Sequence, residues 1–133
     1  MEATTLVLMF ATVTSTYHLP QGLLSSICFV ETRHQPKALV QDDGGSPSIG
    51  ICQIKEATAR IMGYKGTSIQ LRQPKINIKY AGIYLQHQLS RYSGDVVKAV
   101  AAYNAGSNRV DKKGLPKNQK YVKKVLLAWR GNQ

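Results

Sequence analysis

The sequence predicts a mainly α-helical protein with at most a minimal sheet. Apolar residues recur at helical spacing, as Tyr121, Val125 and Trp129 do at every fourth position. The stretch from Asp42 to Ser48 is dense in turn formers and predicts a small hairpin or loop. We expect a single domain over residues 1–133, because a chain of that length buries about two-thirds of its unfolded surface without help from a metal.

The first apolar segment, Leu6–Val13, has two interpretations. Its eight residues fall far short of the roughly 20 that cross a bilayer, so no membrane span is expected. The segment could form the core of a secretion signal within residues 1–18. Against that, residues 1–5 contain Glu2 and no Lys or Arg, and no Ala-x-Ala cleavage site follows.

Two helices are predicted in the next part of the chain. Pro20 suits the first turn of a helix that runs to about His34. Beyond the turn-rich stretch, a short helix is expected from Ala57 to Met62, and Gly63 ends it.

The second half of the chain is predicted to be helical around one long loop. Residues 77–89 form one helix, on which four residues are spaced to share a face: Ile78, Gly82, Leu85 and Leu89. Residues 96–103 are apolar nearly all round, which predicts a buried central helix. Residues 104–118 are glycine-rich and basic and predict a mobile loop, after which the last helix packs the stripe that begins at Tyr121.

The charge of the chain is strongly positive and unevenly placed. The formal net charge is +11, and every Lys and Arg lies at position 33 or later. Such an excess favours polyanionic partners. Recognition of nucleic acid usually adds aromatic residues among the basic ones, or a known binding module, and neither is present, so no nucleic-acid partner is expected.

Glu31 is the residue that points most directly to chemistry. It ends an apolar helical segment, with Ile27 four positions and Cys28 three positions before it, so its carboxyl group projects from the apolar stripe. Hydrocarbon around a carboxyl group disfavours its charged form, so we expect a raised pKa and a proton donor near neutral pH. The alternative is an ordinary ion pair with Arg33 or a Lys.

Five further motifs follow Glu31 in a fixed order. Glu31 opens the run Glu31-Thr32-Arg33-His34-Gln35-Pro36-Lys37-Ala38, and the later motifs are Ser48-Ile49-Gly50-Ile51-Cys52-Gln53-Ile54, Pro74-Lys75-Ile76-Asn77-Ile78, Gly82-Ile83-Tyr84-Leu85, Ala102-Tyr103-Asn104-Ala105-Gly106 and Tyr121-Val122-Lys123-Lys124-Val125. In this order and spacing, the chain from about Leu19 to Trp129 resembles the soluble-type lytic transglycosylases, relatives of goose-type lysozyme that cut bacterial peptidoglycan.

The resemblance implies a lysozyme-like fold with a minimal β-hairpin or loop beside the active-site groove. It also implies a helix just before Leu19 and Pro20, which residues 5–17 would supply. The implied activity is cleavage of the β-1,4 bond between the muramic and glucosamine sugars of peptidoglycan. One Glu performs both proton transfers in this family, so Glu31 would leave 1,6-anhydromuramic ends, with no cofactor and no metal.

The resemblance also implies the residues that contact the substrate: Thr32, Ser48, Gln53, Tyr84, Tyr103, Asn104 and Tyr121. Three stretches depart from the family pattern. Thr32 replaces the usual Ser after the catalytic Glu and keeps a hydroxyl, and Cys52 stands in the stretch that is usually Gly-Leu-Met-Gln. Before Tyr121, residues 117–120 replace the Glu-Thr pair that the family often carries there.

Neither the two cysteines nor the three histidines predict a nucleophile or a metal site. In the family-like arrangement Cys28 and Cys52 line the same groove, so either a disulfide or two buried thiols is compatible with the sequence. His18, His34 and His87 do not have the spacing of metal ligands, so no metal is expected.

Two other functions remain compatible with the sequence. The first is a lysozyme that hydrolyses the same bond with water. Goose-type relatives carry an acidic residue in the loop where Asp42 and Asp43 lie here. A basic, non-catalytic wall-binding protein is the other. We expect a monomer that acts on glycan strands in the periplasm, outside the cell or on a phage particle, and a place in a larger secretion, conjugation or phage assembly is left open.

Overall fold

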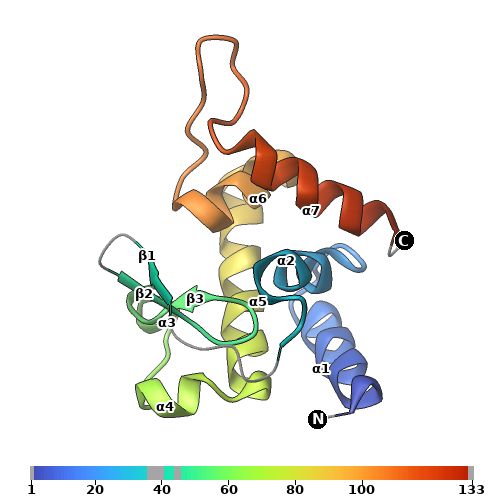
Figure 1. The fold of residues 1–133 in the computed structure, drawn as a ribbon, viewed down its shortest axis with the longest axis vertical. Helices are drawn as coiled ribbons and strands as arrows, with labels where there is room; N and C mark the ends of the chain where they lie inside the picture. The colour runs from blue at the N-terminus through green and yellow to red at the C-terminus, as the bar shows by residue number, and fades with distance from the viewer. Residues whose placement is uncertain (1, 36–40, 44–45, 132–133) are drawn as a thin grey trace.

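A long central helix organises the fold. The computed structural model describes residues 2–35, 41–43 and 46–131 of the chain. Helix α5 (Pro74–Arg91) runs through its middle (Figure 1). Pro74 occupies the first turn of this helix, where no backbone N–H is needed, and Ile78, Ala81 and Leu85 are completely buried on one stripe.

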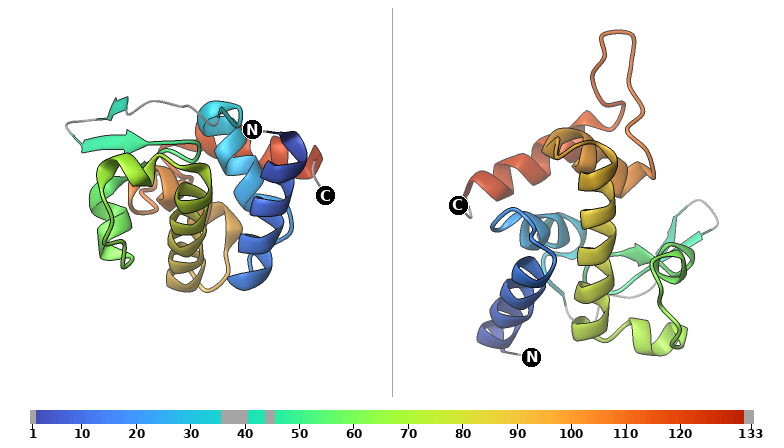
Figure 2. Two further views of the ribbon diagram at one scale, coloured as in Figure 1. Left: turned by 90° about the horizontal axis from the view of Figure 1, so that it is seen from below. Right: turned by 180° about the vertical axis from the view of Figure 1, so that it is seen from behind.

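Four helices build the main core together with α5. They are α1 (Ala3–Thr16), α2 (Leu23–Thr32), α6 (Val96–Ala105) and α7 (Gln119–Gly131). Helix α1 approaches α5 closely because position 82 is glycine: a Cβ atom there would lie 2.3 Å from Cγ1 of Val13. Figure 2 shows that α1 and α2 lie on one side of α5, with the strands, α3 and α4 on the other. The helix predicted over residues 5–17 is therefore present and packs through Phe10 and Val13.

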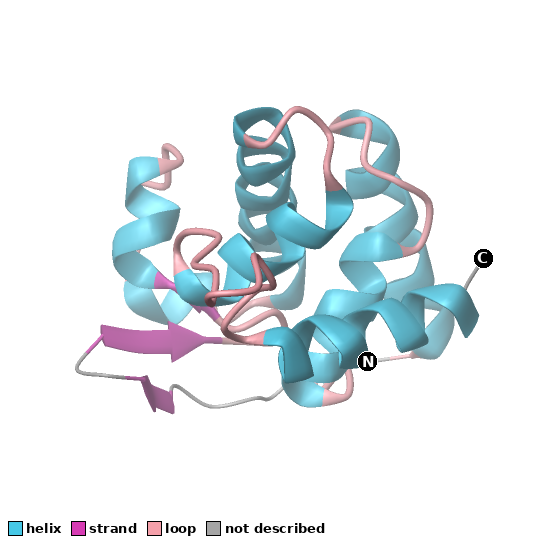
Figure 3. Cartoon of the chain, turned by 90° about the horizontal axis from the view of Figure 1, so that it is seen from above, coloured by secondary structure: helices cyan, strands magenta, loops and turns pink. Residues whose placement is uncertain are grey.

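A small sheet and two short helices form the other side. Strands β1 (Gln41–Asp43), β2 (Ser46–Ile49) and β3 (Ile54–Lys55) pair antiparallel in that order, with Gln41 opposite Ser48 and Ser48 opposite Lys55. Figure 3 shows the strands together at one side of the helices. Gly44 and Gly45, expected at the turn of the hairpin, lie outside the described residues. The predicted mainly α fold with a minimal sheet is confirmed.

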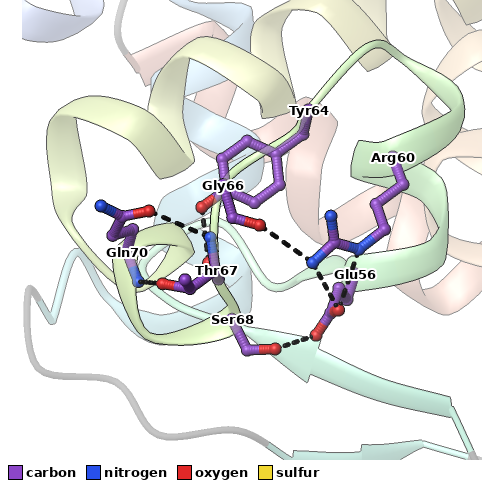
Figure 4. A network of polar contacts seen from close by, with 7 residues as sticks. All are labelled: Glu56, Arg60, Tyr64, Gly66, Thr67, Ser68 and Gln70. Atoms are coloured by element: carbon purple, nitrogen blue, oxygen red, sulfur yellow. Dashed lines mark hydrogen bonds and ion pairs between the residues drawn. The ribbon is translucent and has the colours of Figure 1, made fainter.

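Helices α3 (Glu56–Ile61) and α4 (Ser68–Leu71) are joined by a polar network. The Glu56 carboxylate accepts hydrogen bonds from the Ser68 hydroxyl and from Arg60, whose guanidinium also donates to the carbonyl oxygen of Gly66 at 3.0 Å (Figure 4). The bonds from Ser68 and then from Arg60 lower the pKa of Glu56. Thr67 and Gln70 form a capping box that begins α4. The network holds α3 against α4.

Several predicted elements differ from the observed ones in detail. Helix α2 begins at Leu23 instead of Pro20, because Gly22 has a left-handed backbone with φ of 78°. Helix α6 is buried on all sides from Ala99 to Tyr103, but its first turn is exposed, since Val97 is 39% exposed. The loop predicted after it contains an isolated bridge between Val110 and Pro116.

The cysteine pair forms a disulfide. Cys28 of α2 and Cys52, between β2 and β3, are bonded with their Cα atoms 4.3 Å apart, and both are completely buried. Of the two states compatible with the sequence, the structure contains the bridge. The bond joins the helical side to the sheet side beside Glu31.

Replacing both cysteines with alanine is expected to lower the free energy of unfolding by about 3 kcal/mol, because the open chain regains conformational entropy when unfolded. Urea unfolding, monitored by circular dichroism, measures the loss. A reducing agent should destabilise the native protein by a similar amount and leave the double variant unchanged. Equal stability of the oxidised and reduced native protein would contradict this expectation.

Candidate active site

The site is built around a tight turn between β2 and β3, residues 50–53. Gly50 has φ of +79°, and a Cβ atom at this position would lie 2.3 Å from the amide nitrogen of Asn77. Only glycine satisfies both the backbone conformation and the close approach. Gln53, which is not a glycine, also has a positive φ of 51°. Such a backbone persists in a non-glycine residue only when its surroundings hold it.

The side chain of Asn77 supplies most of that support. Its Oδ1 accepts a hydrogen bond of 2.9 Å from the backbone N–H of Cys52. Its Nδ2 donates to the carbonyl oxygens of Ile49 at 2.8 Å and Leu71 at 2.9 Å. Asn77 is completely buried, so one amide from α5 satisfies three backbone groups that water does not reach.

Two other helices hold the same turn through hydroxyl groups. Tyr103 of α6 donates to the carbonyl oxygen of Cys52 at 2.9 Å. Thr32 of α2 donates to the carbonyl oxygen of Ile51 at 2.6 Å. Gln53 closes the turn itself, since its Nε2 donates to the carbonyl oxygen of Gly50 at 2.9 Å. The turn is therefore fixed to α2, α5 and α6 at once.

Glu31 lies near the end of α2, next to this turn, and is partly buried. Tyr121 of α7 donates a hydrogen bond of 2.8 Å to Oε2 of Glu31. Burial raises the pKa of the Tyr121 phenol well above its usual range, and the charge of Glu31 raises it further. Burial and then Glu31 likewise raise the pKa of Tyr103. Both phenols stay neutral at physiological pH, so they meet Glu31 as uncharged groups.

Glu31 opens into a cavity of about 130 Å³. The sequence-predicted residues that line it are Glu31, Ser48, Gln53, Tyr84, Tyr103 and Asn104. The hydroxyl of Tyr84 donates to the carbonyl oxygen of Ala102 at 3.3 Å, and its ring lies 5.2 Å from that of Tyr103. Two predicted substrate contacts, Thr32 and Tyr121, are not among the lining residues; Thr32 holds the turn and Tyr121 holds Glu31.

Sequence reasoning missed several residues of the site. Lys55 and Thr58 line the cavity. Asn118, in one of the stretches that depart from the family pattern, donates to Oδ1 of Asn104 at 2.9 Å and to the carbonyl oxygen of Ala101 at 3.0 Å. Asn77 carried a detectable signal, because it is a polar residue one position from the apolar stripe of a predicted helix.

The described part of the chain contains neither a candidate metal site nor a candidate membrane-spanning helix. No group of three or more His, Cys, Asp or Glu side chains there is close enough to hold a metal ion. None of its helices combines the length and the apolar character needed to cross a membrane.

Comparison with known proteins identifies the family. The model of the transglycosylase SLT domain matches residues 9–126, and the chain belongs to that family, which confirms the resemblance found in the sequence. Protein IpgF of Shigella flexneri and protein IpgF of Shigella sonnei are each 32% identical to this chain over 100 residues. That stretch covers 73% of this chain and 64% of each relative, so the chain spans less than two-thirds of the length of these curated relatives.

Replacing Asn77 with leucine is expected to lower the free energy of unfolding by about 3 kcal/mol or more, because three buried backbone groups lose their partner. Gln86→Leu is the matched control, since Gln86 lies on the same helix and forms one hydrogen bond, of 3.0 Å to the carbonyl oxygen of Tyr17. Its cost should be about 1 kcal/mol. Equal urea midpoints for the two variants would show that Asn77 does not carry this role.

Proposed function

We propose that this protein is a peptidoglycan lytic transglycosylase that cleaves the β-1,4 bond between N-acetylmuramic acid and N-acetylglucosamine. The observation that carries the proposal is the placement of Glu31: it lines a cavity with Gln53, Tyr103 and Asn104, and Tyr121 holds its carboxyl group. Membership of the SLT family supports the reaction class.

In the proposed reaction Glu31 acts first as an acid and then as a base. It donates its proton to the glycosidic oxygen as the bond from that oxygen to C1 of the muramic sugar breaks. The resulting carboxylate then takes the proton of the C6 hydroxyl, and O6 forms a bond to C1. The product is a 1,6-anhydro ring, no water is consumed, and Glu31 ends in its original protonated state.

The other lining residues divide into two proposed roles. Tyr84 and Tyr103 already donate their hydroxyl hydrogens to backbone carbonyls, so they offer mainly their rings to the sugar faces. Ser48, Gln53 and Asn104 offer polar groups to the hydroxyl and acetamido groups of the glycan. Asn118 orients the Asn104 amide by occupying its oxygen.

The place of action under this proposal is the cell wall, either in the periplasm or outside the cell. The substrate is the glycan strand of peptidoglycan. Small wall enzymes of this kind serve secretion, conjugation or phage assemblies. The proposal includes a role in an assembly of that kind.

A hydrolytic reaction is the second candidate. Asp42 and Asp43 belong to β1, which pairs with β2, and β2 carries Ser48 at the cavity. An aspartate on that strand that positioned a water would convert the same bond cleavage into hydrolysis. The two candidates differ in the chemical end that they leave on the muramic sugar.

Glu31→Gln is expected to reduce the cleavage of purified peptidoglycan by about 10⁴-fold, the upper end for loss of a general acid, because the amide keeps the shape but cannot donate the proton. Loss of turbidity measures the rate, and circular dichroism checks the fold. Glu56→Gln, which removes a carboxylate from the α3–α4 network, should remain within about threefold of the native rate, since it changes no group at the cavity. A Glu31→Gln rate within tenfold of native would refute the assignment.

The product of a complete digest is expected to carry 1,6-anhydromuramic ends, because a tethered C6 hydroxyl competes well with free water once the ring is held correctly. Mass spectrometry distinguishes these ends from reducing ends, which are heavier by one water. Mainly reducing ends, together with loss of activity in an Asp42→Asn, Asp43→Asn double variant, would establish hydrolysis instead.

A further inference from the structure

The positive charge of the chain is concentrated after α6. Residues 106–131 contain eight of the 18 Lys and Arg residues and one of the seven acidic residues, Asp111. The eight are Arg109, Lys112, Lys113, Lys117, Lys120, Lys123, Lys124 and Arg130. Half of them lie on residues 107–118, the segment between α6 and α7, which we call the basic arm. Figure 1 shows the basic arm projecting away from the rest of the fold.

The basic arm has a defined backbone. Val110 bridges Pro116, the N–H of Asp111 donates to the carbonyl oxygen of Leu115 at 2.8 Å, and the N–H of Lys117 donates to the carbonyl oxygen of Arg109 at 2.8 Å. The two sides of the arm are thus paired. The backbone positions that carry the cations therefore have a defined spacing, which a loose tail would lack.

The only acid of the arm is used inside its turn. Oδ1 of Asp111 accepts the backbone N–H of Lys113 at 2.8 Å and that of Leu115 at 3.0 Å. The four basic side chains are exposed, and none forms an ion pair with an acid in the part of the chain that the structure describes. The arm therefore presents its positive charge to solvent.

The arm begins at the wall of the cavity. Gly106 lines the cavity, and its carbonyl oxygen accepts a hydrogen bond of 2.9 Å from Arg91 of α5, which also donates to the Ser107 hydroxyl at 3.0 Å. At the other end, Asn118 bonds to Asn104, which lines the cavity as well. Both ends of the arm are thus tied to the residues that would hold the glycan.

We propose that the basic arm binds carboxylates carried by the substrate polymer beyond the bond that is cleaved. The inference rests on the proposed function for the identity of that polymer. Peptidoglycan strands bear carboxylates on their stem peptides and, where the peptides have been removed, on the lactyl groups of the muramic sugars. A strand seated in the cavity continues past Gly106, so its anionic groups reach the arm without a second binding event. Exposed ion contacts are weak singly, and four of them at one place add to a useful affinity.

Two variants that remove equal charge from different places test the arm. The arm variant replaces Arg109, Lys112, Lys113 and Lys117 with glutamine. The control replaces Lys65, Arg72, Lys75 and Lys79, which are also one arginine and three exposed lysines, in the segment of α4 and the start of α5 at the opposite end of the fold (Figure 1). Both are made in the Glu31→Gln protein, so that binding is measured without cleavage, and thermal melting checks that each is folded.

Co-sedimentation with insoluble purified peptidoglycan gives the affinities. The arm variant is expected to bind about tenfold more weakly than its parent, and the control less than about twofold more weakly. On peptidoglycan whose carboxylates have been converted to amides, the three proteins should bind alike. Binding is then compared on peptidoglycan that keeps its stem peptides and on glycan from which they have been removed. The comparison distinguishes the stem-peptide carboxylates from the lactyl carboxylates.

Equal losses in the arm variant and the control would overturn the proposal, as would a loss that persists on amidated peptidoglycan. An arm variant that loses affinity for duplex DNA but not for peptidoglycan would assign the arm to a different polyanion. If the native chain cuts peptidoglycan while the two variants bind equally, only the role of the arm fails. If the native chain neither binds nor cuts it, the proposed function fails as well.

Discussion

The amide of Asn77 is the interaction on which the rest of the site depends. It satisfies a donor and two acceptors of the backbone, from Ile49 at the end of β2 to Leu71 at the end of α4. An apolar side chain of similar size cannot replace this amide. It would leave the three buried backbone groups without a hydrogen-bond partner and out of reach of water. The arrangement also requires glycine at position 50, because a Cβ atom there would occupy the space of the Asn77 amide.

The position of Glu31 follows from this constraint through covalent and polar links. The turn held by Asn77 contains Cys52, which is bonded to Cys28, one helical turn before Glu31 on α2. Thr32, the next residue after Glu31, is hydrogen-bonded to Ile51 of the same turn. The carboxyl group is therefore positioned from both sides by bonds to one short stretch of backbone. Under the proposed function, a carboxyl group held in this way would lose little freedom when the glycan binds.

The sequence allowed prediction of the elements that are stabilised by a repeating pattern. The helices with apolar stripes, such as α5 and α7, were predicted because each turn repeats the same signal. Helix α4, which is only four residues long, and strand β3, which is two, carry no such repeat. Their stability comes from the capping box of Thr67, from the pairing of β3 with β2 and from packing against α5, so the local pattern does not reveal them.

The residues of the site also divide into those that the sequence predicts and those that it does not. Six of the predicted residues share one cavity, and they were found through the resemblance of ordered motifs and not from chemistry alone. The roles of Asn77 and Asn118 depend on backbone carbonyls brought together by the fold, and a carbonyl has no signature in the sequence. For the same reason Thr32 could be chosen as a site residue while its partner, the carbonyl of Ile51, could not be foreseen.

Under the proposed function Glu31 changes its protonation state twice, and its partner Tyr121 suits that role. A lysine or arginine at that position would hold a carboxylate by charge and would oppose its protonation. A phenol hydroxyl can donate to a carboxylate and can also accept a hydrogen bond from a carboxylic acid. Burial keeps the phenols of Tyr121 and Tyr103 neutral by raising their pKa values, so this flexibility is preserved. The exposed cations of the basic arm, by contrast, are not among the residues that line the cavity, so they do not replace the neutral partner of Glu31.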